Sequence, residues 1–195
     1  MTMDAAKIKQ LRDMTSAGML DCKKALEEAG GDLEKAAEIL RKKGIAKAVK
    51  KMGREAAEGG IFAYIHHNNK LGVLLELNCE TDFVARNEKF QELGKNIAMH
   101  IAASNPQYIK AEDVPEDVIE KEKALQRENL IAEGKPEDKL DKILEGKIRK
   151  FLSEITLLGQ PYVKEPKMTV EDLIKESITT LGENISVKRF TRYEI

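Results

Sequence analysis

Two strand-forming runs joined by a short polar turn constrain the fold of this chain more than any other stretch. The segment GIFAYIHHNNKLGVLLELNCE, residues 60–80, is rich in branched and aromatic residues and is interrupted by Asn68, Asn69 and Lys70, with Gly72 shortly after them. Such runs on either side of a short turn are typical of a β-hairpin. The sequence therefore predicts a hairpin in this region.

The remaining sequence has the composition and spacing of helices. Charged residues make up 34% of the chain and aromatic residues 5%, with no Trp, which favours a helix-rich protein over a large β-sandwich. A helix over 88–104 should pack on the hairpin, because its apolar residues share one face and a proline follows: Phe90, Leu93, Ile97, Ile101 and Pro106. Three more helices are expected at about 116–132, 137–157 and 170–181.

The final segment predicts one more strand. ISVKRFTRYEI, residues 185–195, is rich in branched and aromatic residues. A strand so far from the hairpin joins the sheet last, which gives a three-stranded antiparallel sheet covered by helices on one face. The predicted fold class is therefore α+β, and the other face of the sheet needs cover.

Residues 4 to about 43 predict three short helices. Gly18 is expected to end the first helix and the pair Gly30–Gly31 the second, while Asp32 is a suitable N-cap for the third and Gly44 its C-terminal stop. The apolar spacing within each segment predicts a compact three-helix module.

A basic stretch follows this module. Seven basic residues and no acidic residue occur in it: Arg41, Lys42, Lys43, Lys47, Lys50, Lys51 and Arg54. A solvated linker is the favoured interpretation, and a contact with an anion or an acidic partner is the alternative. The predicted organisation is a three-helix domain at 1–45, a basic linker at 46–59 and an α+β core at 60–195.

The overall charge and hydropathy bear on partners and location. A net charge of -1 and a pI of about 6.4 leave no global field to attract nucleic acid or an anionic membrane. No run approaches the roughly 18 apolar residues of a membrane span, and the first residues, MTMDAAKIKQLRD, lack the apolar core of a signal peptide. We expect a cytoplasmic protein with no membrane contact and no specific nucleic-acid contact.

Residues suited to catalysis or metal binding are few. His66 and His67 are adjacent, and because neighbouring side chains of a strand point to opposite faces, they should not share a metal ion. Cys22 and Cys79 have no histidine close in sequence and are expected to be buried, and His100 is expected to be a packed or rim histidine. Neither a P-loop nor a GxGxxG motif is present. We expect no enzyme, no cofactor and no direct nucleotide binding.

Large apolar residues also occur at two predicted junctions. Met19 and Leu20 follow the turn between the first two helices, and Phe83 and Val84 lie between a strand and a helix. The pattern alone favours packing for Phe83, because an apolar residue just before a helix often packs on its first turn. The alternative is an exposed side chain that anchors a partner protein.

Three longer motifs cover both junctions and the C-terminal region. LRDMTSAGMLDCKKAL at 11–26, ELNCETDFVARN at 76–87 and IRKFLSEITLLGQPYVKEP at 148–166 resemble motifs of the bacterial elongation factor Ts family, which are guanine-nucleotide exchange factors for elongation factor Tu. The resemblance spans nearly the whole chain. It implies a ubiquitin-associated-like domain in the first 45 or so residues and a function in GDP release, after which GTP binds.

The resemblance also assigns roles to individual residues. Four residues are implied to contact the GTPase domain of elongation factor Tu: Arg12, Met19, Leu20 and Lys51. Four consecutive residues are implied to displace its magnesium ion: Thr81, Asp82, Phe83 and Val84. Phe83 would be the intruding side chain, and His100 would lie near the nucleotide-site end.

The chain departs from longer family members. Leu20 stands where many members carry Met, and a second core subdomain and a helical hairpin insertion are expected to be missing after the helix at 88–104. A second copy of the chain is therefore expected to cover the open sheet face, in a homodimer that binds two GTPase molecules. Two other hypotheses are an RNA-binding translation factor that uses residues 41–54, and an enzyme built on Cys79 and a histidine.

Overall fold

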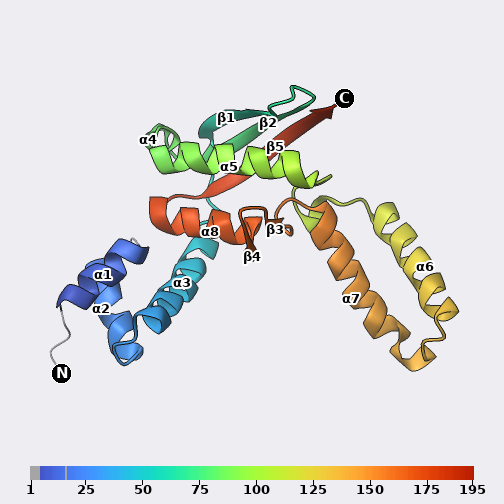
Figure 1. Ribbon diagram of the computed structural model, residues 1–195, viewed down its shortest axis with the longest axis horizontal. Coiled ribbons are helices and arrows are strands. Elements are labelled where there is room, and N and C mark those ends of the chain that lie inside the picture. The colour runs from blue at the N-terminus through green and yellow to red at the C-terminus, as the bar shows by residue number, and fades with distance from the viewer. Residues whose placement is uncertain (1–4, 16) are drawn as a thin grey trace. The chain divides into compact units, whose positions relative to one another are not determined.

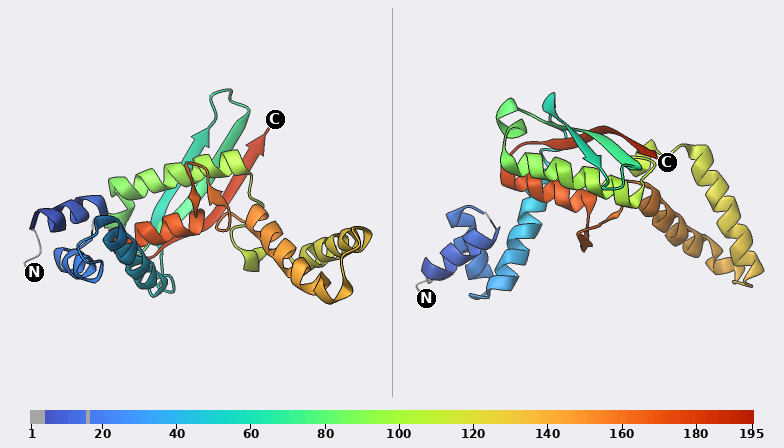
Figure 2. Two further views of the ribbon diagram at one scale, coloured as in Figure 1. Left: turned by 60° about the horizontal axis from the view of Figure 1, so that its bottom comes forward. Right: turned by 45° about the horizontal axis from the view of Figure 1, so that its top comes forward.

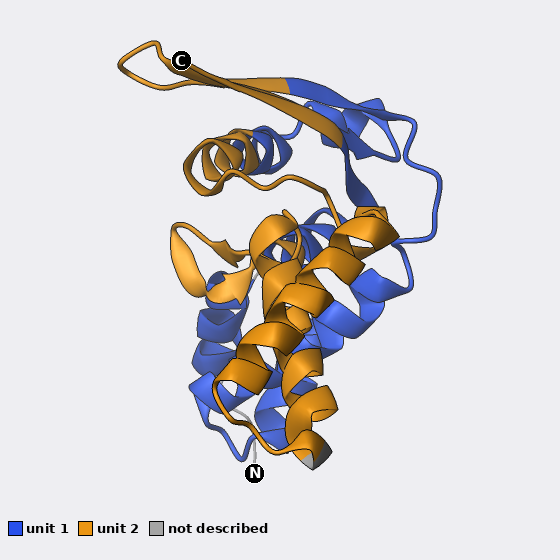
Figure 3. Ribbon diagram, turned by 90° about the vertical axis from the view of Figure 1, so that its right-hand side faces the viewer, with its two compact units in different colours: residues 1–61, 76–94, 172–188 blue, residues 62–75, 95–171, 189–195 orange. Residues whose placement is uncertain are grey.

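The computed structural model describes residues 5–15 and 17–195 (Figure 1). Asp4, where the first helix was expected to begin, and Ser16 of the first motif lie outside the described residues. Contacts divide the chain into two compact units (Figure 3). Unit 1 comprises residues 1–61, 76–94 and 172–188, and unit 2 comprises residues 62–75, 95–171 and 189–195.

Three helices at the start of unit 1 confirm the predicted three-helix module: α1 (Ala5–Thr15), α2 (Met19–Glu28) and α3 (Leu33–Val49). Their buried side chains form one cluster: Leu11, Cys22, Ala25, Leu26, Ala36 and Leu40. Asp32 caps α3 as expected, since its carboxylate accepts a hydrogen bond of 3.0 Å from the Lys35 amide. Gly30 and Gly31, with φ of 64° and 86°, separate α2 from α3.

The prediction that Gly44 ends the third helix is wrong. Helix α3 continues to Val49, so the first residues of the predicted linker are helical. Instead, Gly44 lets the Thr179 side chain pack closely against α3, because a Cβ atom at Gly44 would lie 2.8 Å from Cγ2 of Thr179. Thr179 belongs to α8 (Val170–Leu181). The domain boundaries at 45 and 59 stay predictions.

The main sheet consists of the three strands that the sequence predicts. Its strands are β1 (Glu58–Ile65), β2 (Leu71–Cys79) and β5 (Ile185–Glu194), antiparallel in the order β1-β2-β5. Helices cover it, and within unit 1 the start of α5 (Glu88–Ser104) and most of α8 lie on the same side of the strands (Figure 2). The predicted α+β class is therefore confirmed.

The hairpin turn corrects the argument made for the two adjacent histidines. Strand β1 ends at Ile65, so His66 and His67 lie in the turn, where their ring centroids are only 4.2 Å apart. The alternation of side chains in a strand does not apply beyond the strand's end. Among the side chains that the structure describes, no group of three or more from His, Cys, Asp or Glu is arranged to hold a metal ion.

Unit 2 contains a helical pair and a small hairpin. Helix α6 (Glu116–Ala132) packs along α7 (Glu137–Ile155), which corrects the expectation that a helical hairpin is missing (Figure 1). A short 3-10 helix, η1 (Ala111–Asp113), precedes them. Strands β3 (Pro161–Tyr162) and β4 (Glu165–Thr169) form an antiparallel pair that was not expected from the sequence. None of the described helices is both long and apolar enough to cross a membrane.

Gly59 provides a test of how β1 and β2 approach each other in unit 1. A Cβ atom at Gly59 would overlap the Leu77 carbonyl oxygen, and the φ of Gly59 is 148°. We predict that Gly59→Ala lowers the free energy of unfolding by more than about 2 kcal/mol, measured by chemical denaturation. Gly53→Ala is the matched control, because nothing lies within 4 Å of a Cβ atom there, and equal losses in both variants would contradict the prediction.

Candidate functional site

The segment Thr81–Val84 begins a short helical turn after the second strand, and of its four residues only Phe83 is exposed. Thr81 is the N-cap of α4 (Asp82–Ala85), and its hydroxyl oxygen accepts a hydrogen bond of 3.4 Å from the Val84 amide. The Phe83 side chain is 82% exposed, while Ala85 is buried. The pattern-based prediction that Phe83 packs in the core is therefore wrong, because this turn directs it into solvent.

Hydrogen bonds to two carboxylates join this turn and the residue before it to the loop at residues 183–184. The Thr81 amide and hydroxyl donate hydrogen bonds of 3.0 and 2.6 Å to the two oxygens of Glu183. In return, Oε1 of Glu80 accepts a hydrogen bond of 2.6 Å from the Asn184 amide. Glu183 and Asn184 were not predicted as site residues, because they lie about a hundred residues away and no local pattern marks them.

The C-terminal end of α4 is tied down separately. Nε2 of Gln91 donates a hydrogen bond of 2.7 Å to the Ala85 carbonyl, and Asp82 forms an ion pair of 2.9 Å with Arg86. The turn is thus bonded at both ends while Phe83 projects from its first residues. Such an arrangement presents one aromatic side chain at a fixed place on the surface.

Cys79 lies two residues before Thr81, and its surroundings favour the protonated thiol over the nucleophilic thiolate. Its side chain is fully buried, and its thiol donates a hydrogen bond of 3.2 Å to the Thr81 carbonyl. Burial, followed by the negative charge of Glu183, raises the pKa of Cys79 to about 11. The thiol therefore stays protonated near neutral pH, which fits its predicted role as a small buried side chain.

A second exposed apolar surface lies at the junction of α1 and α2. Met19 is 59% exposed and Leu20 is 65% exposed, and Arg12 on α1 is exposed as well. Met14, at 58% exposed, belongs to the same region and was not predicted as a partner contact. The described residues of this junction thus offer three large apolar side chains to a partner.

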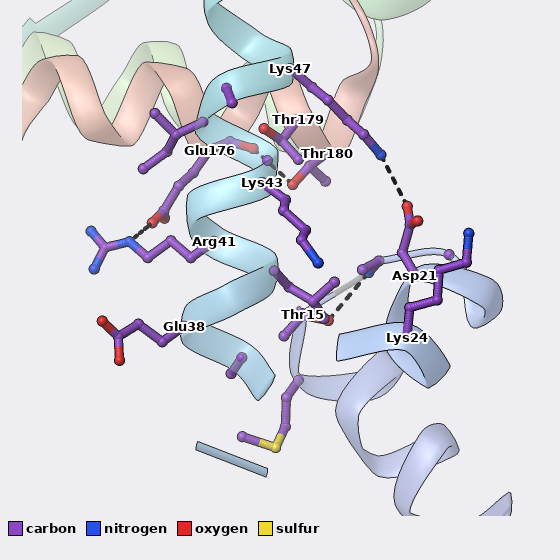
Figure 4. Close-up of a pocket in the computed structure, with 18 residues that line it drawn as sticks. Thr15, Asp21, Lys24, Glu38, Arg41, Lys43, Lys47, Glu176, Thr179 and Thr180 are labelled. Atoms are coloured by element: carbon purple, nitrogen blue, oxygen red, sulfur yellow. Dashed lines mark hydrogen bonds and ion pairs between the residues drawn. The ribbon is translucent and has the colours of Figure 1, made fainter. Parts of the chain in front are cut away.

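A cavity of about 940 Å³ borders this junction within unit 1. Residues of the α1–α2 junction, α3 and α8 line it, and Figure 4 shows Asp21 facing Lys47 and Arg41 facing Glu176 across its sides. These ion pairs have distances of 3.0 and 2.7 Å. The cavity is therefore a groove with charged rims.

Lys51 and the basic stretch are engaged within the chain. Nζ of Lys51 donates a hydrogen bond of 2.6 Å to the Gly182 carbonyl, next to the Glu183 loop. Five more basic residues of the stretch form ion pairs with carboxylates: Arg41, Lys42, Lys43, Lys47 and Arg54. This positive charge is largely neutralised locally.

His100 is buried in unit 2. Its Nε2–H donates to Oε1 of Gln160 at 2.9 Å, and its Nδ1 accepts from the Val163 amide at 3.2 Å. Oε1 of Gln160 is the acceptor here, because Nε2 of the same side chain donates to the carbonyls of Ser104 and Glu154. The expectation of a packed histidine is confirmed, whereas the implied place near a partner's nucleotide site stays a prediction.

Comparisons with known proteins agree with the motifs. The family model described as elongation factor TS matches residues 4–195. The chain belongs to the elongation factor Ts family. Elongation factor Ts of Thermosipho melanesiensis is 58% identical over 99% of this chain and 98% of its own length. Elongation factor Ts of Fervidobacterium nodosum is 56% identical over 100% of this chain and 99% of its own length.

A third relative shows how the lengths compare within this family. Elongation factor Ts of Carboxydothermus hydrogenoformans is 53% identical over 96% of this chain and 87% of its own length. The family identified from the three motifs is therefore confirmed across the whole chain. The turn at Thr81–Val84, with its exposed Phe83, and the junction at Met19 and Leu20 lie in two of those motifs.

Burial of His100 makes the stability of the protein depend on pH. Burial lowers the pKa of His100 below its ordinary value of 6.5, with the bond to Gln160 opposing this in part. As the pH falls below about 6.5, the His100 imidazole becomes protonated in the unfolded chain but stays neutral in the folded chain. The free energy of unfolding therefore falls by up to about 1.4 kcal/mol per pH unit. We predict this loss in chemical denaturation between about pH 8 and pH 5.5.

Two variants separate His100 from the other histidines. His100→Gln should remove this part of the pH dependence, because no imidazole remains to titrate at that position. His67→Gln is the control, since His67 is exposed in the hairpin turn. A pH dependence that persists unchanged in His100→Gln would contradict the assignment.

Proposed function

We propose that this protein promotes the release of GDP from elongation factor Tu, with Phe83 as the side chain that disturbs the magnesium site of the GTPase. The observation that supports this best is the exposure of Phe83 on a turn held at both ends. An exposed aromatic residue on a fixed support is the kind of residue that dominates a protein interface. GTP then binds the emptied site because it is in excess.

The chemistry of exchange requires no nucleophile and no cofactor. A GTPase holds GDP through backbone amides, a lysine and a magnesium ion that contacts the phosphates. If an exchange factor binds the nucleotide-free GTPase more tightly than the GDP-bound form, linkage requires that it weakens GDP binding by the same factor. A side chain that fits only when magnesium has left supplies this difference in affinity.

The two exposed surfaces have separate roles in this proposal. Met19 and Leu20, together with Arg12, contact the GTPase domain and contribute affinity, as does Lys51 at the end of the basic stretch. Phe83 acts on the nucleotide site, supported by Asp82 and Val84 of the same turn. His100 contributes through the packing of unit 2, because its buried side chain presents no surface of its own.

The two rival hypotheses have less support. An RNA-binding surface needs free positive charge, but most basic residues between 41 and 54 are paired with carboxylates. An enzyme built on Cys79 needs an accessible thiolate, and Cys79 is buried with a raised pKa.

We predict that Phe83→Ala slows stimulated GDP release by about tenfold or more, because it removes the side chain proposed to act on the nucleotide site. The measurement is the release of fluorescent GDP from elongation factor Tu with saturating factor. The thermal midpoint should stay unchanged, since Phe83 is 82% exposed. Leu125→Ala is a matched control, because Leu125 is an exposed apolar residue of α6.

Met19→Asp separates docking from exchange in the same assay. It places a charge on the exposed junction, so it should raise the concentration of factor needed for half-maximal stimulation while leaving the saturating rate close to that of the wild type. An unchanged rate in Phe83→Ala would remove Phe83 from its proposed role.

We also propose that two copies of the chain pair through the open face of the sheet. In unit 2, the strands β1, β2 and β5 expose the apolar side chains of Ile65, Leu74 and Tyr193. Exposed apolar residues on neighbouring strands form the kind of surface that a second subunit covers. A two-fold pair would let the same face meet itself.

Light scattering tests this dimer. The wild type should have twice the chain mass of 21.9 kDa at micromolar concentration, and Leu74→Lys should shift it to the monomer, because a buried lysine opposes pairing. Leu125→Lys on α6 should leave the mass unchanged. A well-behaved wild-type monomer would overturn the proposal.

A further inference from the structure

The loop between α8 and β5 is bonded reciprocally to the loop between β2 and α4. Glu183 accepts two hydrogen bonds from Thr81, through the amide at 3.0 Å and the hydroxyl at 2.6 Å. Glu80 accepts one from the Asn184 amide at 2.6 Å. Each loop thus supplies a carboxylate to the backbone of the other, and all four residues belong to unit 1.

The bonds to Glu183 complete a helix cap that the local sequence leaves unfinished. In a capping box, the N-cap side chain accepts from the N3 amide, and an acidic or amide side chain at N3 accepts from the N-cap amide. Here Thr81 is the N-cap and the N3 residue is Val84, whose side chain has no hydrogen-bond acceptor. Glu183 takes the place of the missing N3 acceptor from 102 positions away.

Other contacts strengthen the loop that carries Glu183. Nδ2 of Asn184 donates to the carbonyls of Met52 and Arg54 at 3.3 and 2.6 Å. Nζ of Lys51 donates to the Gly182 carbonyl at 2.6 Å. The two residues on either side of Glu183 in the chain are therefore both hydrogen-bonded to residues 51–54.

We propose that Glu183 is a positioning residue for nucleotide exchange, which holds the turn Thr81–Val84 so that Phe83 is fixed before the GTPase arrives. The inference rests on the proposed function of Phe83. A helix of four residues is too short to be stable alone, so its position depends on such tertiary bonds. Hydrogen bonds to a charged group are the stronger kind, and the pair from Thr81 fixes direction as well as distance.

This role predicts a specific kinetic effect. Glu183 does not lie among the exposed residues proposed to dock the GTPase, so its loss should lower the saturating rate more than the affinity. We expect Glu183→Ala to lower the maximal rate of stimulated GDP release about tenfold, with less than about a twofold change in half-saturating concentration. Glu183→Gln should lie between this variant and the wild type, because its amide oxygen can accept from the Thr81 amide while its NH2 group cannot accept from the hydroxyl.

A double variant separates positioning from general damage to the fold. If Glu183 acts through Phe83, then Glu183→Ala should cause no further loss of maximal rate in a Phe83→Ala background. Glu145→Ala is the matched control, because it removes a carboxylate from an exposed pair with Arg149 on α7. Additive losses in the double variant would overturn the proposal.

Hydrogen exchange of the free protein tests the same proposal without elongation factor Tu. In Glu183→Ala, the amides of Ala85, Arg86 and Asn87 should exchange about tenfold faster than in the wild type, because they are protected by the turn that Thr81 caps. Protection should be largely retained in Glu183→Gln, which serves as the folded variant. Unchanged protection in Glu183→Ala would overturn the positioning role, whereas a wild type that fails to stimulate GDP release would overturn the proposed function alone.

Discussion

The functional surface depends on the reciprocal hydrogen bonds between residues 80–81 and residues 183–184, in which each loop supplies one carboxylate acceptor. Strand β2 ends at Cys79 and α5 begins at Glu88, so a short connection has to turn and present an aromatic residue outward. A single helical turn has little stability of its own. The hydrogen bonds that Glu183 accepts from Thr81, and the one that Glu80 accepts from Asn184, replace the support that a longer helix would provide.

The same interaction explains how an exposed Phe83 is compatible with a stable fold. The core below the turn does not depend on that ring, because Cys79 and Ala85 are buried on either side of it in the sequence. Large apolar side chains normally gain free energy by burial, so one left in solvent suggests a partner surface. Met19 and Leu20 are likewise exposed, while Cys22 and Leu26 of the same helix are buried.

Much of the fold could be predicted because its signals are local. The helices at 88–104, 116–132 and 170–181 were found with their observed bounds, since each has a clear apolar spacing and a proline or glycine near its end. Gly44 was misjudged because the close approach of Thr179 is a tertiary fact, and a glycine within a helix looks like a stop. The small β3–β4 hairpin was missed because its strands are too short to show alternation.

The candidate site was less predictable, because its essential contacts join distant segments. The pattern around Phe83 favoured the core, and only the resemblance to a family reversed that preference. Glu183 had no local signal, since an acidic residue after a helix-ending glycine is ordinary on a protein surface. An exchange factor benefits from such contacts, because ordering a loop on binding costs about 1–2 kcal/mol per residue. When hydrogen bonds fix the turn during folding, more of the interaction with the partner remains available to distort its nucleotide site.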